Sequence, residues 1–241
     1  MSSRFKFALA AVSACSLFVG GPAVAQTFAL ESTSGLRLHN VQAEPVTRDG
    51  KRGLRVTVSA DAKQKLQDLP IDQQSRLETL VLIEGTDFKN GDIEAEISGA
   101  PAPDAPEGAR GFVGIAFRVG SDLETYDAFY LRPTNGRADD QVRRNHSVQY
   151  VSHPAWPWNR LRKEFPERYE SYVDLEPGVW TRIRIEVRGE RARLFVHGQP
   201  QPTLIVNDLK TGVDGKGAVA LWINPGTIAH FRALRVSELR Q

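Results

Sequence analysis

The side chains best suited to chemistry are concentrated between residues 132 and 172. This segment holds eight Lys or Arg residues against five Asp or Glu residues, together with two of the four tryptophans of the chain. Flat aromatic rings pack against the C–H face of a sugar, and planar guanidinium and amide groups bind pairs of hydroxyls. Arginine also binds a carboxylate through two parallel hydrogen bonds. The segment therefore favours a carbohydrate site, and an acidic sugar is the narrower hypothesis.

The candidate ligand-binding residues each suit one of these roles. They lie in this segment and in the strands that lead into it, and they are Arg118, Tyr130, Arg132, Asn135, Arg143, Arg144, Asn145, Gln149, Trp156 and Trp158. The structural alternative is a surface network of ion pairs, with the tryptophans packing the segment down. If residues 145–150 form a strand, Asn145 and Gln149 share one face. His146 and Tyr150 then share the other face.

Four residues are candidates for catalysis. His146 is the best general acid or base by residue type, because the ordinary pKa of histidine lies near neutrality. Tyr150 is the candidate proton shuttle beside it, and Glu167 and Glu170 are the hydrolytic alternatives. The open functional alternatives are a glycan-binding protein, an enzyme that cleaves glycans, and a non-catalytic module that binds another envelope protein.

Asp92, Glu94 and Glu96 alternate with apolar residues and form a ladder of carboxylates. Residues two apart on a strand lie on the same face, about 6.5–7 Å apart, so such a ladder is able to flank a sugar. The simpler expectation is an outward, solvated face of a sheet, and we assign these three residues no catalytic role.

Residues 1–25 predict an export signal. Arg4 and Lys6 precede an apolar run, and Ala23-Val24-Ala25 supplies the small residues of a cleavage site. Cleavage leaves 241 − 25 = 216 residues with 31 − 2 = 29 basic and 29 acidic residues. This zero net charge argues against a nucleic-acid partner. No later stretch is long and apolar enough to span a membrane.

Cleavage after Ala25 also removes the only cysteine, Cys15. A chain without thiols suits an oxidising compartment, so we expect a periplasmic or extracellular protein. The stretch Val12-Ser13-Ala14-Cys15 has the form of a lipoprotein box, and anchoring through Cys15 is the minority alternative.

Short alternating segments dominate the rest of the chain. Residues 54–58, 92–97, 181–187 and 191–196 alternate apolar and polar residues, which is typical of strands with one face in a core. Residues 111–117 and 217–223 are apolar throughout and predict central strands covered on both faces, while residues 228–236 would close a sheet. The one helix expected is 60–69, which ends before Pro70.

About twelve such strands predict an all-β fold, a two-sheet antiparallel jelly-roll sandwich with one short helix. We expect residues 26–241 to form a single domain, with residues 132–172 as its functional insert. No nucleotide-binding glycine loop, Gly-x-Ser-x-Gly elbow or His-Glu-x-x-His helix is present, and the five histidines are scattered. No metal-binding residues are therefore assigned.

From about residue 87 to residue 238 the pattern resembles the concanavalin A-like lectin/glucanase superfamily. The resemblance rests mainly on residues 88–94, 111–118, 126–133, 180–185, 194–198 and 217–222. Within the superfamily the chain looks most like laminin-G-like domains and the 3-keto-disaccharide hydrolase domains of bacterial exported proteins. The resemblance implies a jelly roll with a carbohydrate ligand on its concave face.

The same resemblance bears on catalysis and on cofactors. His146 with Tyr150 is similar to the His/Tyr pair of jelly-roll polysaccharide lyases, and the acidic ladder is similar to that of family 16 glycoside hydrolases. The superfamily often carries a structural calcium ion, for which Asp208 and Asp214 in a glycine-rich turn are the candidates; the alternative is that they are ordinary turn residues. No other cofactor is expected.

Overall fold

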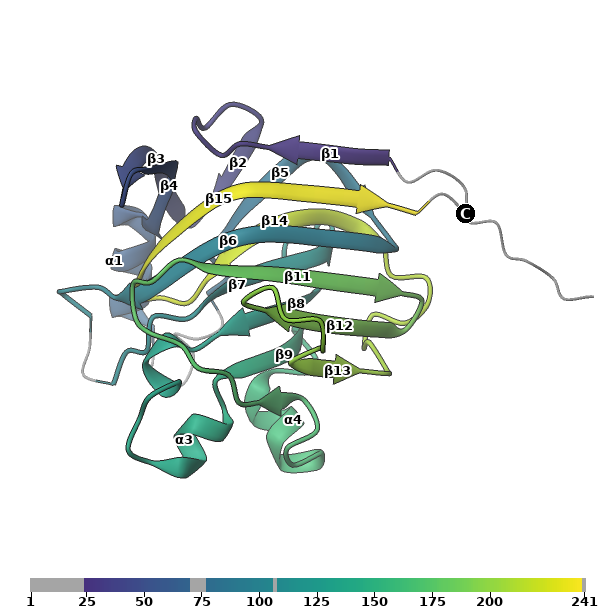
Figure 1. The fold of residues 1–241 in the computed structure, drawn as a ribbon. Coiled ribbons are helices and arrows are strands. Elements are labelled where there is room, and N and C mark those ends of the chain that lie inside the picture. Colours follow the sequence, from purple (N-terminus) through teal and green to yellow (C-terminus); the bar gives the residue numbers. More distant parts are fainter. Residues whose placement is uncertain (1–23, 70–76, 106–107, 240–241) are drawn as a thin grey trace, which may run out of the picture.

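Two antiparallel sheets stack face to face in the computed structural model, which describes residues 24–69, 77–105 and 108–239 (Figure 1). The first sheet runs in the order β13-β12-β11-β6-β15-β4-β3, and β1 also pairs with β15. Its strands are β1 (Val24–Phe28), β3 (Val41–Arg48), β4 (Lys51–Val58), β6 (Gly91–Pro101), β11 (Thr181–Arg188), β12 (Arg191–Val196), β13 (Leu204–Val206) and β15 (Thr227–Glu238).

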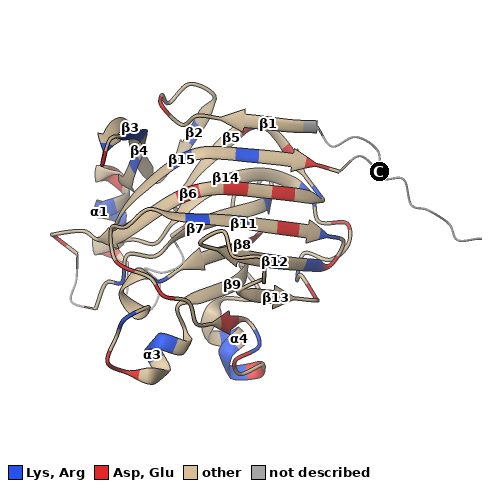
Figure 2. Ribbon diagram, viewed as in Figure 1, with Lys and Arg blue, Asp and Glu red and all other residues tan. Residues whose placement is uncertain are grey.

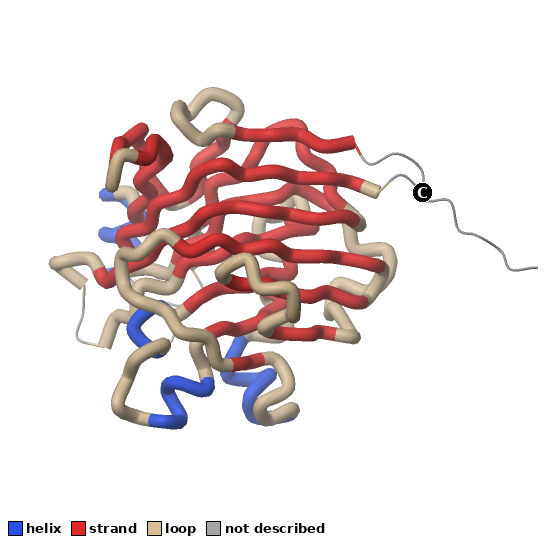
Figure 3. Tube along the Cα trace, in the orientation of Figure 1, coloured by secondary structure: helices blue, strands red, loops and turns tan. Residues whose placement is uncertain are grey.

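The second sheet runs in the order β10-β9-β8-β7-β14-β5-β2. Its strands are β2 (Leu36–His39), β5 (Leu80–Phe88), β7 (Val113–Val119), β8 (Tyr126–Leu131), β9 (Val148–His153), β10 (Glu170–Ser171) and β14 (Gly217–Ile223). The predicted all-β sandwich is therefore confirmed, and strands dominate the trace in Figure 3.

The first sheet follows its sequence alternation. Along β6, Ile93, Ala95 and Ile97 are buried in the core, while the three acidic residues between them point outward. Those carboxylates pair with basic residues of neighbouring strands, as Glu94 does with Arg182 at 2.9 Å. Figure 2 shows the mixed charges along β6, β11 and β15. The acidic ladder is the outward, ion-paired face that the sequence favours.

The second sheet is covered on both faces at its centre, as predicted. Every residue of β7 and of β8 is buried, and β14 lies between β7 and β5. Phe117 on the inner face packs edge-on against Phe88 and parallel to Phe129. Gly114 on the outer face is required, because an added Cβ would lie 2.2 Å from a backbone oxygen of β8.

The predicted helix is confirmed, and one predicted strand position is wrong. α1 (Ala60–Asp68) begins at Ser59, whose hydroxyl accepts a hydrogen bond from the Ala62 amide. Residues 189 and 190 form the two-residue turn between β11 and β12. β15 does not close its sheet but lies between β6 and β4, because its long edges pair with both strands.

Residues 132–172 are more regular than their sequence indicates. They form a 3-10 turn, η1 (Pro133–Asn135), the helices α3 (Gln141–Asn145) and α4 (Trp158–Glu164), and the strands β9 and β10 of the second sheet. Within the described residues, no helix has the length and hydrophobicity needed to cross a bilayer. The candidate signal sequence and Cys15 lie outside the described residues, except that Val24 and Ala25 begin β1.

Candidate functional site

Strand periodicity divides the candidate residues between the two faces of the second sheet. On β8, Asp127 and Phe129 point into the sandwich, so Tyr126 and Tyr130 point outward. On β9, Gln149 pairs directly with Tyr130 and shares its outward direction. The outer face of this sheet thus presents aromatic and amide groups close to the end at which β8 leaves the sheet.

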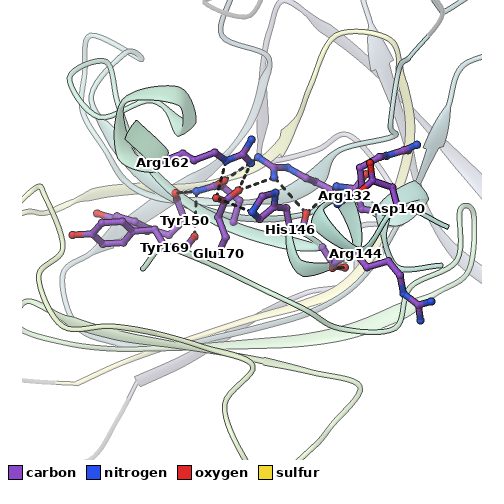
Figure 4. A network of polar contacts seen from close by, with 12 residues as sticks. Arg132, Asp140, Arg144, His146, Tyr150, Arg162, Tyr169 and Glu170 are labelled. Carbon is purple, nitrogen blue, oxygen red and sulfur yellow. Dashed lines mark hydrogen bonds and ion pairs between the residues drawn. The ribbon is translucent and has the colours of Figure 1, made fainter. Parts of the chain in front are cut away.

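A buried ion pair organises this end of the outer face. The Arg132 Nη1 atom donates to Glu170 Oε1 at 2.9 Å, and both side chains are only 3% exposed. Arg162, on the last turn of α4, donates to the same carboxylate from Nε at 2.9 Å and from Nη2. Figure 4 shows both guanidinium groups directed at this one carboxylate, with His146 beside it. Glu170 thus ties α4 to the sheet.

The remaining hydrogen bonds of Arg132 fix its plane. Its Nη2 atom donates to the Tyr130 hydroxyl at 3.0 Å and to Gln149 Oε1 at 2.9 Å. Its guanidinium lies 5.2 Å from the ring centre of Phe112 and 6.0 Å from that of Trp158. A cation held by fixed acceptors and flanked by rings is pre-organised, so little entropy is lost when a ligand meets this surface.

Beside this pair lies a pocket of about 320 Å³, here called the arginine pocket. It is lined by Gly108, Ala109, Arg110, Phe112, Arg132, Trp158, Arg162 and Asn224. Trp158 is 42% exposed and lies under the Arg162 guanidinium, 4.8 Å away. Three of the lining residues are arginines, and the pocket joins them to two aromatic rings.

The arginine pocket carries surplus positive charge. Arg132 and Arg162 share the one carboxylate, whereas the Arg110 guanidinium makes no hydrogen bond or salt bridge with any described residue. Burial, followed by repulsion from Arg143, Arg132 and Arg162, lowers the pKa of Arg110, although the charge of Asp140 acts in the opposite direction. An anion bound here would relieve that repulsion and accept hydrogen bonds from the fork of Arg110.

A second pocket, of about 230 Å³, lies on the other side of Glu170 and is here called the histidine pocket. It is lined by Asn145, His146, Glu167, Glu170, Ser171 and Tyr172. His146 Nε2 lies 3.6 Å from Glu170 Oε2. Burial lowers the pKa of His146 despite the nearby carboxylate, so the imidazole is neutral at pH 7.

The state of Glu170 limits its chemistry. Burial alone would raise the pKa of Glu170, but the hydrogen bonds and charges of Arg162 and Arg132 outweigh burial and lower it. A general acid at neutral pH needs the opposite shift. At neutral pH this lowered pKa favours the carboxylate form, in which Glu170 binds both arginines.

Several predicted site residues serve the interior instead. Tyr150 points into the sandwich and donates to Asp127 at 2.7 Å, because it lies one residue from outward-facing Gln149. Arg118 lies in a bulge with φ +57° and donates to the carbonyls of Lys89, Gly189 and Gly212. Asn135 is buried and donates to the His146 carbonyl at 2.9 Å.

Others lie at the margin of the site. Arg144 points away from the network in Figure 4 and packs over the Tyr172 ring at 5.6 Å. Asn145 ends α3 instead of starting a strand, so it does not share a sheet face with Gln149. Trp156 does not line the arginine pocket, and the Arg160 guanidinium packs 3.7 Å from the Trp156 ring centre. Arg143 also lies on α3.

Four further residues of this surface were not predicted from the sequence. Arg110, Phe112 and Asn224 line the arginine pocket from loops that flank the second sheet. Trp222 on β14 stacks on Tyr130 at 4.8 Å. These residues lie far from 132–172 in sequence, and only the pairing of β14 with β7 and of β7 with β8 brings them together.

A second polar cluster, on the outer face of the second sheet, was also not predicted from the sequence. His153 Nδ1 lies 3.0 Å from Glu78 Oε1, and Tyr126 donates to the same carboxylate. Trp222 Nε1 in turn donates to the Tyr126 hydroxyl at 3.1 Å. Both oxygens of the Glu78 carboxylate, just before the start of β5, therefore have polar partners.

The two carboxylates considered for calcium are both paired with cations. Asp208 accepts from Lys210 at 2.8 Å and from the Tyr169 hydroxyl at 2.7 Å, and Asp214 lies 3.2 Å from Lys89. Across the described ranges no three His, Cys, Asp or Glu residues are grouped as metal ligands.

No protein-family model matches the chain, and no curated protein sequence matches it. Its fold does resemble solved structures. One is a Bacillus subtilis protein of unknown function with a galectin-like fold, at 12% identity and TM-score 0.50, covering 93% of this chain and 100% of that one. Another is the Ca²⁺-bound exoplasmic/lumenal domain of VIP36, at 9% identity and TM-score 0.51, covering 89% and 90%.

A third is the carbohydrate-binding module CBM66 from Bacillus subtilis, at 10% identity and TM-score 0.44, covering 84% of this chain and 94% of that one. At these identities the likeness concerns the fold. This chain therefore shares a two-sheet antiparallel sandwich fold with these two solved structures, the galectin-like protein and the VIP36 domain.

Proposed function

We propose that this protein is exported and binds carbohydrate in the arginine pocket, and that the bound sugar carries a carboxylate. The observation that carries the proposal is the unpaired Arg110 guanidinium in a pocket walled by the rings of Phe112 and Trp158. The rings offer flat apolar faces to a sugar, and Arg110 offers a planar fork to its carboxylate. The concanavalin A-like fold by itself does not specify a ligand, so the pocket carries the argument.

Binding is favoured over cleavage by the chemistry of the lining. The charged groups of the arginine pocket are guanidinium donors, which stabilise an anion but do not exchange protons near neutral pH. The Glu170 carboxylate, which Arg132 and Arg162 both bind, is held ionised by these two arginines. A glycoside hydrolase or a polysaccharide lyase remains the second hypothesis, because His146 and Glu167 line the adjoining histidine pocket.

The test is binding of a uronic acid oligosaccharide, and of its neutral carboxyl-reduced analogue, by isothermal titration calorimetry. Arg110→Gln should weaken binding of the acidic ligand about tenfold, the value of one charge-assisted hydrogen bond. It should leave binding of the neutral analogue nearly unchanged. Trp158→Ala should weaken binding of both ligands, because it removes an exposed wall of the pocket.

The matched control is Arg160→Gln. Arg160 lies on α4, as Trp158 does, and it pairs with Glu164 at 2.9 Å. It does not line the arginine pocket. This variant should bind like the wild type. Equal affinity of Arg110→Gln and wild type for the acidic ligand would refute the proposed carboxylate contact. Absence of binding across a panel of glycans would favour a protein-interaction module, and new reducing ends or unsaturated products would favour an enzyme.

Export is tested separately. Secretion in a bacterial host should give a mature chain that begins at Gln26, which mass spectrometry of the purified protein would establish. A lipid-modified chain that begins at Cys15 would instead support anchoring to a membrane.

A further inference from the structure

The histidine pocket differs from the arginine pocket in chemical character. Its lining combines the amide of Asn145, the hydroxyl of Ser171, the carboxylate of Glu167 and a neutral imidazole. Neutral sugars are bound by such mixtures of donors and acceptors, because each hydroxyl both donates and accepts. The lining carries no surplus of arginine, so it offers little to a second carboxylate.

An exposed ring borders the same pocket. Tyr172 is 44% exposed, and the Arg144 guanidinium covers its ring at 5.6 Å and donates to its hydroxyl at 3.4 Å. Cover by Arg144 restricts the ring to one orientation. A fixed and partly exposed aromatic face is suited to stacking against the C–H side of a sugar.

Glu167 is placed here at a conformational cost. Its φ of +64° is in the left-handed region, which is unfavourable for a residue with a side chain. Its carboxylate makes no hydrogen bond or salt bridge with any described residue, although its charge acts on His146. The pocket therefore contains an acceptor that the described protein groups leave unused.

The two pockets adjoin each other. Glu170 lines the histidine pocket and accepts hydrogen bonds from two residues that line the arginine pocket. Arg132 also donates to the His146 carbonyl at 3.3 Å. A single ion pair thus separates a site for an acidic sugar from a site for a neutral one.

We propose that the histidine pocket is a second sugar subsite, so that the ligand is a heteroglycan in which an acidic and a neutral sugar are neighbours. The acidic unit occupies the arginine pocket, and the neutral unit stacks on Tyr172 and donates a hydroxyl to Glu167. This inference rests on the proposed function, because it assigns the unit adjacent to the acidic sugar.

The experiment compares three ligands by calorimetry: a free uronic acid, an oligosaccharide of alternating uronic acid and neutral sugar, and a homopolymeric uronic acid oligosaccharide of equal length. The wild type should bind the alternating ligand at least tenfold more tightly than either of the others. Tyr172→Ala should lower the affinity for the alternating ligand about fivefold to tenfold, which is the contribution of one aromatic contact. It should leave the affinity for the free uronic acid unchanged.

Tyr172→Phe is the matched control, since it keeps the ring and removes only the hydroxyl, and it should retain wild-type affinity for the alternating ligand. Glu167→Gln should lower the affinity for the alternating ligand and leave the affinities for the other two ligands unchanged. The inference is overturned if Tyr172→Ala binds the alternating ligand like the wild type, or if the homopolymer binds as tightly. If Arg110→Gln loses binding of all three ligands and Tyr172→Ala has no effect on binding, the proposed function is supported and the second subsite is rejected. Failure of the wild type to bind any of the three would reject both.

Discussion

Replacing Glu170 with glutamine should destabilise the protein strongly, because it leaves Arg132 as a buried charge without its counter-ion. The Arg132 side chain is 3% exposed, whereas Arg162 is 35% exposed and is able to regain water. Removing one partner of a buried ion pair costs about 3–5 kcal/mol. Glutamine retains one acceptor oxygen, so we expect about 3 kcal/mol, at the lower end of that range.

The assay is equilibrium unfolding in urea. For a chain of this size the slope is about 3 kcal/mol per M, so the midpoint of Glu170→Gln should fall by roughly 1 M. Glu164→Gln is the control, because Glu164 makes an exposed pair with Arg160. Such pairs contribute about 0.5 kcal/mol, which corresponds to a shift of about 0.2 M. A midpoint for Glu170→Gln no lower than that of Glu164→Gln would refute the reasoning.

The pH dependence provides a second check on the same residue. Burial raises the folded-state pKa of Glu170, but the two arginines outweigh burial, so this pKa is lowered from 4.5. The unfolded chain therefore takes up this proton first as the pH falls. The stabilisation by Glu170 is complete above pH 4.5 and is lost as the pH falls through the folded-state pKa. The difference between wild type and Glu170→Gln should accordingly shrink below pH 4.5.

Three further predictions concern the scaffold. Gly114→Ala should lower the unfolding free energy by about 3 kcal/mol or more, because its Cβ would lie 2.2 Å from the Phe129 carbonyl oxygen, and urea unfolding measures this. Ser59→Ala should cost about 1 kcal/mol through loss of the α1 cap, and a cost below 0.2 kcal/mol in the same assay would contradict that role. Burial, then the charge of Arg48, lowers the pKa of His230 to about 4. Protonation therefore favours the unfolded chain, and wild-type stability should fall between pH 6.5 and pH 4 more steeply than that of His230→Gln.

The fold was largely predictable because hydrophobic alternation reports directly on strands. The alternation in residues 92–97 and 181–187 fixes which side chains enter the core, and the structure places them so. The position of β15 was not predictable in the same way. Its sequence indicates a strand, but the order of strands in a sheet depends on pairings between residues far apart in the chain.

The candidate site was predictable only in part. Composition identified Arg132, Gln149 and Trp158, which the structure brings together around one surface. Alternation correctly separated Tyr150 from Gln149, but it does not say which face of the strand is outward, so Tyr150 was predicted as a catalytic partner of His146 although it points into the sandwich. Arg110 stands alone in its stretch of sequence and had no signal that distinguished it from a surface arginine.

The anchoring of α4 has a consequence for engineering. The segment leaves the sheet after a bridge between Ser152 and Trp156 and returns at Glu170, to which Arg162 is tied. Randomised libraries confined to residues 158–167, with Leu161, Arg162 and Phe165 kept, would thus vary the walls of both pockets while the strands on either side stay paired. Selection from such libraries offers a route to binders with altered sugar preference on an unchanged sandwich.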